Sequence, residues 1–223
     1  MTDNPSHKAR RRLLDAALEL APFEGWTGEM LRIAAKQAGL PEGADALYFP
    51  GGPLEVIRFW NLELNTACWD RLQALDLDTM RIRDKVTAGV LARFEAMEGH
   101  EEAARRALAR LALPDGLSLG PQLLWGAADT IWRAIGDVST DINYYTKRAT
   151  LSGVLSSTLA AWLADETPKK TKARAFLDAR IENVMQFEGA KWKLKNRLKD
   201  LPDPLEIMGA LRFGPASRRR RRG

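Results

Sequence analysis

The chain has 223 residues, of which 45% are hydrophobic, and a single cysteine. This composition excludes an intrinsically disordered protein, an internal disulfide and a cysteine-rich metal cluster. The N-terminus lacks the apolar core of a signal peptide, and no apolar run approaches the roughly 18 residues of a membrane-spanning helix. We therefore expect an intracellular soluble protein that can associate peripherally with a membrane.

The net charge of +5 is unevenly distributed along the chain. Residues 189–223 hold eleven Lys or Arg against three Asp or Glu, a net of +8, so the preceding residues sum to −3. An anionic partner is therefore expected at the C-terminal end.

The first 52 residues predict three short helices, over about 6–23, 27–39 and 41–47. Thr27 stands at the start of the second, where its hydroxyl can accept a hydrogen bond from a free backbone N–H. Three short helices before a larger helical part are typical of a helix-turn-helix module. We expect residues 1–52 to form such a module.

The third predicted helix, Pro41 to Leu47, has no Lys, Arg, Asn or Gln and carries two acids. A recognition helix enters the major groove of DNA, and cations around it bind phosphates. Residues 1–58 hold seven cations and eight anions, a net of −1. Lys8 and Arg10–Arg12 could touch phosphate, but the reading helix would repel it. We therefore predict no sequence-specific DNA binding and a module retained as a scaffold.

The rest of the chain also predicts helices, and no β-hairpin pattern is found. The expected segments are a helix starting at Pro53, one over about 82–97, a short one after His100, a loop at 114–121, a helix through 124–135, and a last long helix at about 171–201. Cys68 lies on an apolar helical pattern, which favours a buried, unreactive thiol.

The segment Ser139–Arg148 places two tyrosines, an acid, an amide and two cations at the start of another helix. The residues after it form one apolar helical face, made by Leu151, Val154, Leu155, Thr158, Leu159 and Trp162. The polar group therefore ends a buried helix, where it can meet a ligand or a partner.

A catalytic site is not predicted. The chain has two histidines, His7 in an N-terminus expected to be mobile and His100 beside a loop, and lacks paired Glu-x-x-His motifs, a phosphate loop and a nucleophile elbow. Asp141 and Tyr145 could in principle exchange protons, but an acid at a helix start is more often a cap. We expect a non-enzyme with no metal or cofactor.

The segment Ser139–Arg148, its continuation to Trp162, and Phe176–Val184 resemble the accessory proteins of ubiquinone biosynthesis. These are TetR-like lipid-binding proteins that assist the demethoxyubiquinone hydroxylase, and the resemblance extends more weakly from about Arg10 to Phe213. It implies an all-α, TetR-like bundle in which 53–201 binds lipid and forms a homodimer through the helices around 119–187.

The resemblance also implies a cavity that holds an isoprenoid or phospholipid. The residues expected to line it are Trp60, Leu64, Trp125, Ile135, Val154, Leu155, Thr158 and Trp162. The alternative is that these side chains form an ordinary aromatic-rich core, which periodicity alone does not distinguish from a pocket.

A partner surface is implied as well. The family's hydroxylase contacts match Asp141, Tyr144 and Tyr145, with Ile131 and Trp132 nearby, and Tyr144 stands where relatives often have tryptophan. The alternative is that Asp141 caps the helix and the tyrosines only cover its first turn.

Residues 202–223 predict a short amphipathic helix and a basic tail that dock on an anionic membrane. The residues expected to contact it are Leu205, Ile207, Met208, Leu211, Phe213, Arg218, Arg219 and Arg220. The alternatives are a helix folded on the body with a solvated tail, non-specific RNA binding, or a cloning remnant.

Together these features favour a lipid-binding protein of the bacterial cytoplasm, peripheral at the inner membrane, which presents a quinone precursor to a hydroxylase. The alternatives are a TetR-type regulator that senses a small apolar ligand and a scaffold without ligand.

Overall fold

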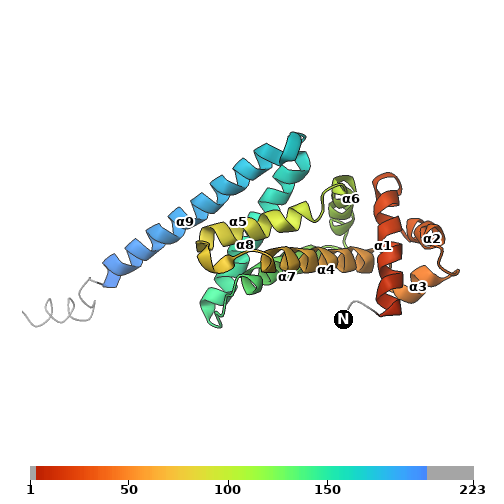
Figure 1. Ribbon diagram of the computed structural model, residues 1–223, viewed down its shortest axis with the longest axis horizontal. Helices are drawn as coiled ribbons and strands as arrows, with labels where there is room; N and C mark the ends of the chain where they lie inside the picture. Colours follow the sequence, from red (N-terminus) through yellow and green to blue (C-terminus); the bar gives the residue numbers. More distant parts are fainter. Residues whose placement is uncertain (1–3, 200–223) are drawn as a thin grey trace, which may run out of the picture. The chain divides into compact units, whose positions relative to one another are not determined.

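The structure is a computed structural model that describes residues 4–199, with side chains for residues 4–186. In this part of the chain the predicted all-helical fold is confirmed (Figure 1). The α-helices are α1 (Pro5–Glu24), α2 (Gly28–Gln37), α3 (Ala44–Tyr48), α4 (Gly52–Gln73), α5 (Ile82–Glu95), α6 (Glu101–Leu111), α7 (Leu119–Ala134), α8 (Ile142–Ala164) and α9 (Thr171–Lys199). Short 3₁₀ turns at Leu77–Thr79 and Pro168–Lys170 precede α5 and α9.

The chain divides into two compact units, Met1–Ile181 and Glu182–Gly223, and α9 begins in the first unit and continues into the second. All contacts and pockets described below belong to the first unit. The expected division at residues 52 and 201 stays a prediction.

The first three helices begin and end where local chemistry predicts. Asn4 caps α1, because its Oδ1 accepts a hydrogen bond from the N–H of Ser6 at 3.0 Å. The predicted cap of α2 is confirmed, since Thr27 Oγ1 accepts from the N–H of Met30 at 3.1 Å. The helix expected from Pro41 starts later, at Ala44, because Gly43 has a left-handed φ of 79°.

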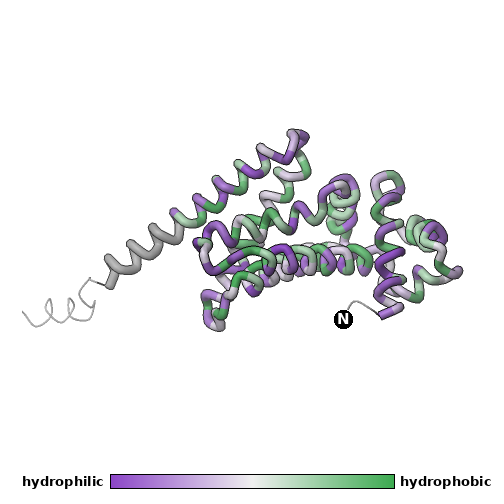
Figure 2. The backbone as a smooth tube through the Cα atoms, in the orientation of Figure 1, coloured by the Kyte–Doolittle hydropathy of each residue, from purple (hydrophilic) through white to green (hydrophobic). Residues whose placement is uncertain are grey.

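The core lies between the long helix α4 and the helices around it. Val56, Cys68 and Leu72 of α4 are fully buried. Figure 2 shows the hydrophilic beginning of α1 and the hydrophobic residues interspersed along α4 and α7. The indole N–H of Trp26 donates to the carbonyl of Ala103 at 3.0 Å, which joins the connection between α1 and α2 to α6.

Two expectations about the middle of the chain are tested directly. The loop predicted at 114–121 is too long, because α7 already begins at Leu119 and its first turn holds Pro121, where no backbone N–H is needed. The burial of Cys68 is confirmed: its Sγ donates to the carbonyl of Gly89 at 3.3 Å. Burial raises the pKa of this thiol to about 11, so it stays protonated at neutral pH.

None of the helices described between residues 4 and 199 is long and apolar enough to span a bilayer. The residues expected to contact a membrane, Leu205 to Arg220, lie outside the described residues.

Candidate functional site

The polar segment before and within the first turns of α8 forms a network of hydrogen bonds and ion pairs. Asp141 is the N-cap of α8, and its Oδ1 accepts from the N–H of Asn143 at 2.9 Å. The amide of Asn143 also donates to Asp141 Oδ2 at 3.0 Å. The capping role weighed above is therefore present, and Asp141 is at the same time exposed to solvent.

A buried arginine organises the residues behind this cap. Arg148 is 1% exposed, its Nε donates to Asp129 Oδ1 at 2.7 Å, and its Nη1 donates to Asp137 Oδ2 at 3.1 Å. Lys147 Nζ donates to Asp137 Oδ1 at 2.6 Å, and Ser139 Oγ donates to the same oxygen at 2.8 Å. The cluster ties α7, the loop after it and α8 together.

The hydrogen bonds of this cluster stabilise the charged forms of Asp137 and Arg148. Burial alone would raise the pKa of Asp137, but hydrogen bonds from Lys147, Ser139 and Arg148 outweigh it and hold that pKa at about 2. Burial acts to lower the pKa of Arg148, and its hydrogen bonds to Asp129 and Asp137 raise it overall. Asp137 is therefore suited to hold Arg148 in place, because an acid this strong cannot exchange protons near neutrality.

The two adjacent tyrosines occupy different environments. Tyr144 is half-buried: its hydroxyl donates to Asp129 Oδ1 at 3.3 Å, and the Arg148 guanidinium lies 3.5 Å from its ring centroid. Tyr145 is 62% exposed and meets Tyr144 edge-on, with ring centroids 5.1 Å apart. Trp125, expected in the lipid cavity, lies beside both tyrosines, with ring centroids 6.4 Å from Tyr144 and 6.3 Å from Tyr145.

The other residues expected at the partner surface are less accessible. Ile131 is fully buried, so it can only support this surface from below. Trp132 donates its indole N–H to the carbonyl of Lys147 at 3.1 Å. Val138 and Ile142 are exposed apolar residues beside this surface that the sequence analysis did not identify. The isoleucine within a polar helix start could have indicated such a contact. We call Asp141, Ile142 and Tyr145 the α8 patch.

An apolar pocket of about 500 Å³ lies among α4, α5, α6, α7 and α8. Trp60 and Leu64, two of the residues expected at a lipid cavity, line this pocket, and Leu155 lines a smaller cavity of about 60 Å³ that shares Leu64 and Arg93 with it; lipid binding there stays a prediction. The remaining predicted lining residues, Ile135, Val154, Thr158 and Trp162, are buried and line neither space. Trp162, for example, packs on Phe94 with ring centroids 5.5 Å apart.

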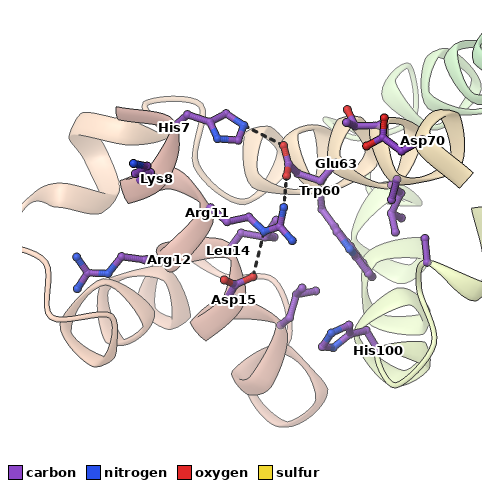
Figure 3. Close-up of a pocket in the computed structure, with 15 residues that line it drawn as sticks. His7, Lys8, Arg11, Arg12, Leu14, Asp15, Trp60, Glu63, Asp70 and His100 are labelled. Carbon is purple, nitrogen blue, oxygen red and sulfur yellow. Dashed lines mark hydrogen bonds and ion pairs between the residues drawn. The ribbon is translucent and has the colours of Figure 1, made fainter. Parts of the chain in front are cut away.

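A second pocket, of about 750 Å³ and lined by both charged and apolar side chains, lies between the start of α1 and α4 (Figure 3). His7 Nε2 is 3.0 Å from Glu63 Oε1, and Arg11 pairs with Glu63 as well. His7 therefore belongs to an ordered helix and not to a mobile terminus. Trp60 lines both pockets, so α4 forms the wall between them.

The cations at the start of α1 are engaged within the chain. Arg10 pairs with Glu55 at 3.0 Å and lies over the rings of Phe49 and Phe59 at 4.5 and 4.6 Å. Arg12 donates to the carbonyl of Ala38. In the part of the chain that the structure describes, no three His, Cys, Asp or Glu side chains gather as metal ligands.

Comparison with known proteins shows which proteins this chain resembles. Residues 117–188 match the COQ9 family, and they include both the Arg148 cluster and the α8 patch. The chain is similar to the ubiquinone biosynthesis protein COQ9 of Rattus norvegicus, with 31% identity over 80% of this chain and 59% of that protein. It is 31% identical to COQ9-B of Xenopus laevis, over 79% of this chain and 62% of that protein. It is 29% identical to COQ9 of Homo sapiens, over 80% of this chain and 58% of that protein.

The chain thus spans about three fifths of the length of these relatives, whose names assign them to mitochondria. Among solved structures, a TetR transcriptional regulator from Nitrosomonas europaea superposes with a TM-score of 0.64 and 16% identity, over 78% of this chain and 97% of that one. This likeness confirms the TetR-like fold alone. The resemblance expected from Ser139–Arg148 is confirmed: the chain is similar to the COQ9 proteins of ubiquinone biosynthesis.

Proposed function

We propose that this protein is a non-catalytic lipid-binding protein that takes up a hydrophobic quinone precursor and presents it to a hydroxylase of ubiquinone biosynthesis. Its COQ9 relatives support a role in that pathway. The observation that carries the proposal is the pocket of about 500 Å³, which lies within the range of about 300–1,000 Å³ typical of small-molecule sites.

The need for such a protein follows from the cost of exposing an isoprenoid tail. Apolar surface in water costs about 25 cal/mol per Å², so a tail leaves a bilayer readily only when a cavity covers it. The rim of the pocket is apolar, since Leu108 and Leu117 are 44% and 60% exposed. A tail longer than the pocket can therefore pass over this rim.

The α8 patch is the proposed contact for the hydroxylase. Ile142 and Tyr145 are 77% and 62% exposed, and they stand three residues apart on the same side of α8. The Arg148 cluster fixes the helix start from behind, so the patch is already ordered before a partner binds. Homodimerisation through 119–187, docking of 202–223 on an anionic membrane and a place at the bacterial inner membrane belong to the same proposal.

The alternative of a DNA-binding regulator has less support. Its fold matches a TetR regulator, but α3 has five residues with Asp45 in its first turn. Arg10, Arg11 and Arg12 would have to leave their partners within the chain before binding phosphate.

The test fills the pocket from one wall. Ala107 of α6 lines the pocket and is 6% exposed, whereas Ala109 on the same helix is exposed and lines no part of it. Ala107→Phe should lose the isoprenoid lipid that native mass spectrometry detects on the protein purified from cells, and lower ubiquinone production. Ala109→Phe adds the same ring to the surface and should change neither. Equal lipid loading of the two variants would contradict the proposal.

A further inference from the structure

One amide group in the apolar pocket has its oxygen engaged and its nitrogen free. Asn61 of α4 lines the pocket and is 9% exposed, and its Oδ1 accepts a hydrogen bond from Nη2 of Arg93 on α5. A guanidinium only donates hydrogen bonds, so this contact fixes which end of the amide is the oxygen and turns Nδ2 of Asn61 away from Arg93. Among the described residues Nδ2 has no acceptor, and unlike Nη1 of Arg93 it is not closed off from solvent. A ligand in the pocket can therefore reach this donor.

The pocket offers a ligand several donors and hardly any acceptor. Of the side chains that line it, only those of Trp60, Asn61, Arg93 and Ser156 carry nitrogen or oxygen. An indole and a guanidinium can only donate, and Oδ1 of Asn61 is already engaged. Ser156 has an oxygen that can accept, but this residue is exposed to solvent. The buried part of the pocket therefore suits an uncharged group that accepts hydrogen bonds and does not donate them.

This property distinguishes the two redox forms of a quinone ring. A quinone has only acceptors, so a ring carbonyl beside Asn61 gains a hydrogen bond and brings no donor of its own. A hydroquinone brings hydroxyl groups, and a hydroxyl group that is buried without an acceptor loses the hydrogen bond that it had in water. Both forms are uncharged at neutral pH, so the difference between them lies in hydrogen bonding.

We propose that the pocket selects the oxidised form of the quinone precursor, with one ring carbonyl accepting a hydrogen bond from Nδ2 of Asn61. The tail then leaves over the apolar rim at Leu108 and Leu117. This inference rests on the proposed lipid-binding function and adds the redox state of the ligand. Asn61 is thus a specificity-determining residue, and its hydrogen bond is uncharged and weak enough for the ring to leave when the precursor is passed on.

The test compares decylbenzoquinone with decylhydroquinone, two probes that share one tail and differ only in the redox state of the ring. Binding to the full chain, stripped of lipid, is measured by equilibrium dialysis under anaerobic conditions, which keep the hydroquinone reduced. We expect the quinone to bind at least about fivefold more tightly. This ratio converts to about 1 kcal/mol, the lower end of the cost of leaving a buried polar group without a partner.

A variant then assigns the preference to Asn61, because any apolar space also favours the less polar quinone to some extent. Asn61→Asp keeps the shape of the side chain and a partner for Arg93, but it replaces the donor by an oxygen that accepts. The ratio of quinone to hydroquinone affinity should therefore fall at least about fivefold. The control Asn65→Leu removes the other nearly buried amide of α4, which is 8% exposed and does not line the pocket, and should keep the ratio.

A second measurement needs no variant and decides the matter even if Asn61→Asp does not fold. A carbonyl group that accepts a hydrogen bond absorbs infrared light at a lower wavenumber than the same group in an alkane. Decylbenzoquinone with isotope-labelled carbonyls, bound to the unmodified protein, should therefore show one carbonyl band at a lowered wavenumber. If both bands stay where they lie in an alkane, the protein does not bind the ring through a hydrogen bond, and the inference is wrong.

The outcomes separate the inference from the proposed function. Equal affinity of the unmodified protein for the two probes would overturn the selection of the oxidised form and leave lipid binding intact. An unchanged ratio in a folded Asn61→Asp variant would overturn the role of Asn61 in the same way. Failure of the unmodified protein to bind either probe would overturn both the inference and the proposed function.

Discussion

Replacing Tyr144 by alanine should weaken the folded state as well as the partner surface, whereas replacing Tyr145 should affect the surface alone. The sequence treats these neighbours alike, but the structure places the Tyr144 ring under the buried Arg148 and leaves Tyr145 mostly in solvent. The pair therefore tests whether the Arg148 cluster supports the start of α8.

The magnitude follows from the contacts that each variant loses. The Tyr144 hydroxyl bonds to Asp129 at 3.3 Å, a long hydrogen bond that contributes about 1 kcal/mol. The guanidinium at 3.5 Å from the ring is desolvated, which makes this cation–π contact about 2 kcal/mol. Tyr144→Ala should thus lose about 3 kcal/mol, or about 6–12 °C in melting temperature for a chain of this size. Tyr145→Ala loses exposed ring contacts of about 0.5–1 kcal/mol.

Thermal unfolding followed by circular dichroism measures both variants, and Tyr144→Phe, which keeps the ring, should lose only the hydroxyl's share of about 1 kcal/mol. Binding to the hydroxylase is then measured well below the melting point of each variant. Tyr145→Ala should weaken this binding at nearly unchanged stability. If Tyr144→Ala melts like the unmodified protein, the ring does not support the cluster, and the argument from its contacts is wrong.

Two further predictions concern packing and pH. In Gly89→Ala the new Cβ would lie 2.6 Å from Cγ2 of Ile131 on α7, so the free energy of unfolding should fall by about 1–3 kcal/mol. The control Gly153→Ala meets open space and should stabilise α8 slightly. Equal melting temperatures of the two variants would contradict this packing. The pKa of Asp137 is about 2 in the folded protein, below its ordinary value of 3.8, so the unfolded chain binds more protons in this range. The stability that Asp137 contributes is therefore present above pH 3.8 and is lost as the pH falls toward 2. Asp137→Asn should therefore lose less stability than the unmodified protein between pH 3.8 and 2, as measured by urea unfolding at each pH. If the free energy of unfolding falls with pH equally in both proteins, the role assigned to this carboxylate is wrong.

The features that the sequence determined by itself are local ones. Thr27 and Asp141 cap α2 and α8 through hydrogen bonds that reach two or three residues along the chain, so their roles can be read from residue type and position. The helix after Ser139–Arg148 was also predictable, because its apolar face repeats with the helical period. The family resemblance rested on the same continuous segment.

Tertiary structure alone decided which residues meet across helices. Arg148 reaches Asp129 and Asp137 over 19 and 11 positions, and Arg93 reaches Asn61 over 32 positions. A helical repeat of apolar residues shows that one face of the helix is covered, but not whether protein or a cavity covers it. Trp60 and Trp162 both lie on apolar helix faces and are both buried, yet Trp60 lines the pocket and Trp162 does not. The pocket depends on how five helices pack, because the empty volume is set by the spaces between side chains from separate elements and not by any one of them.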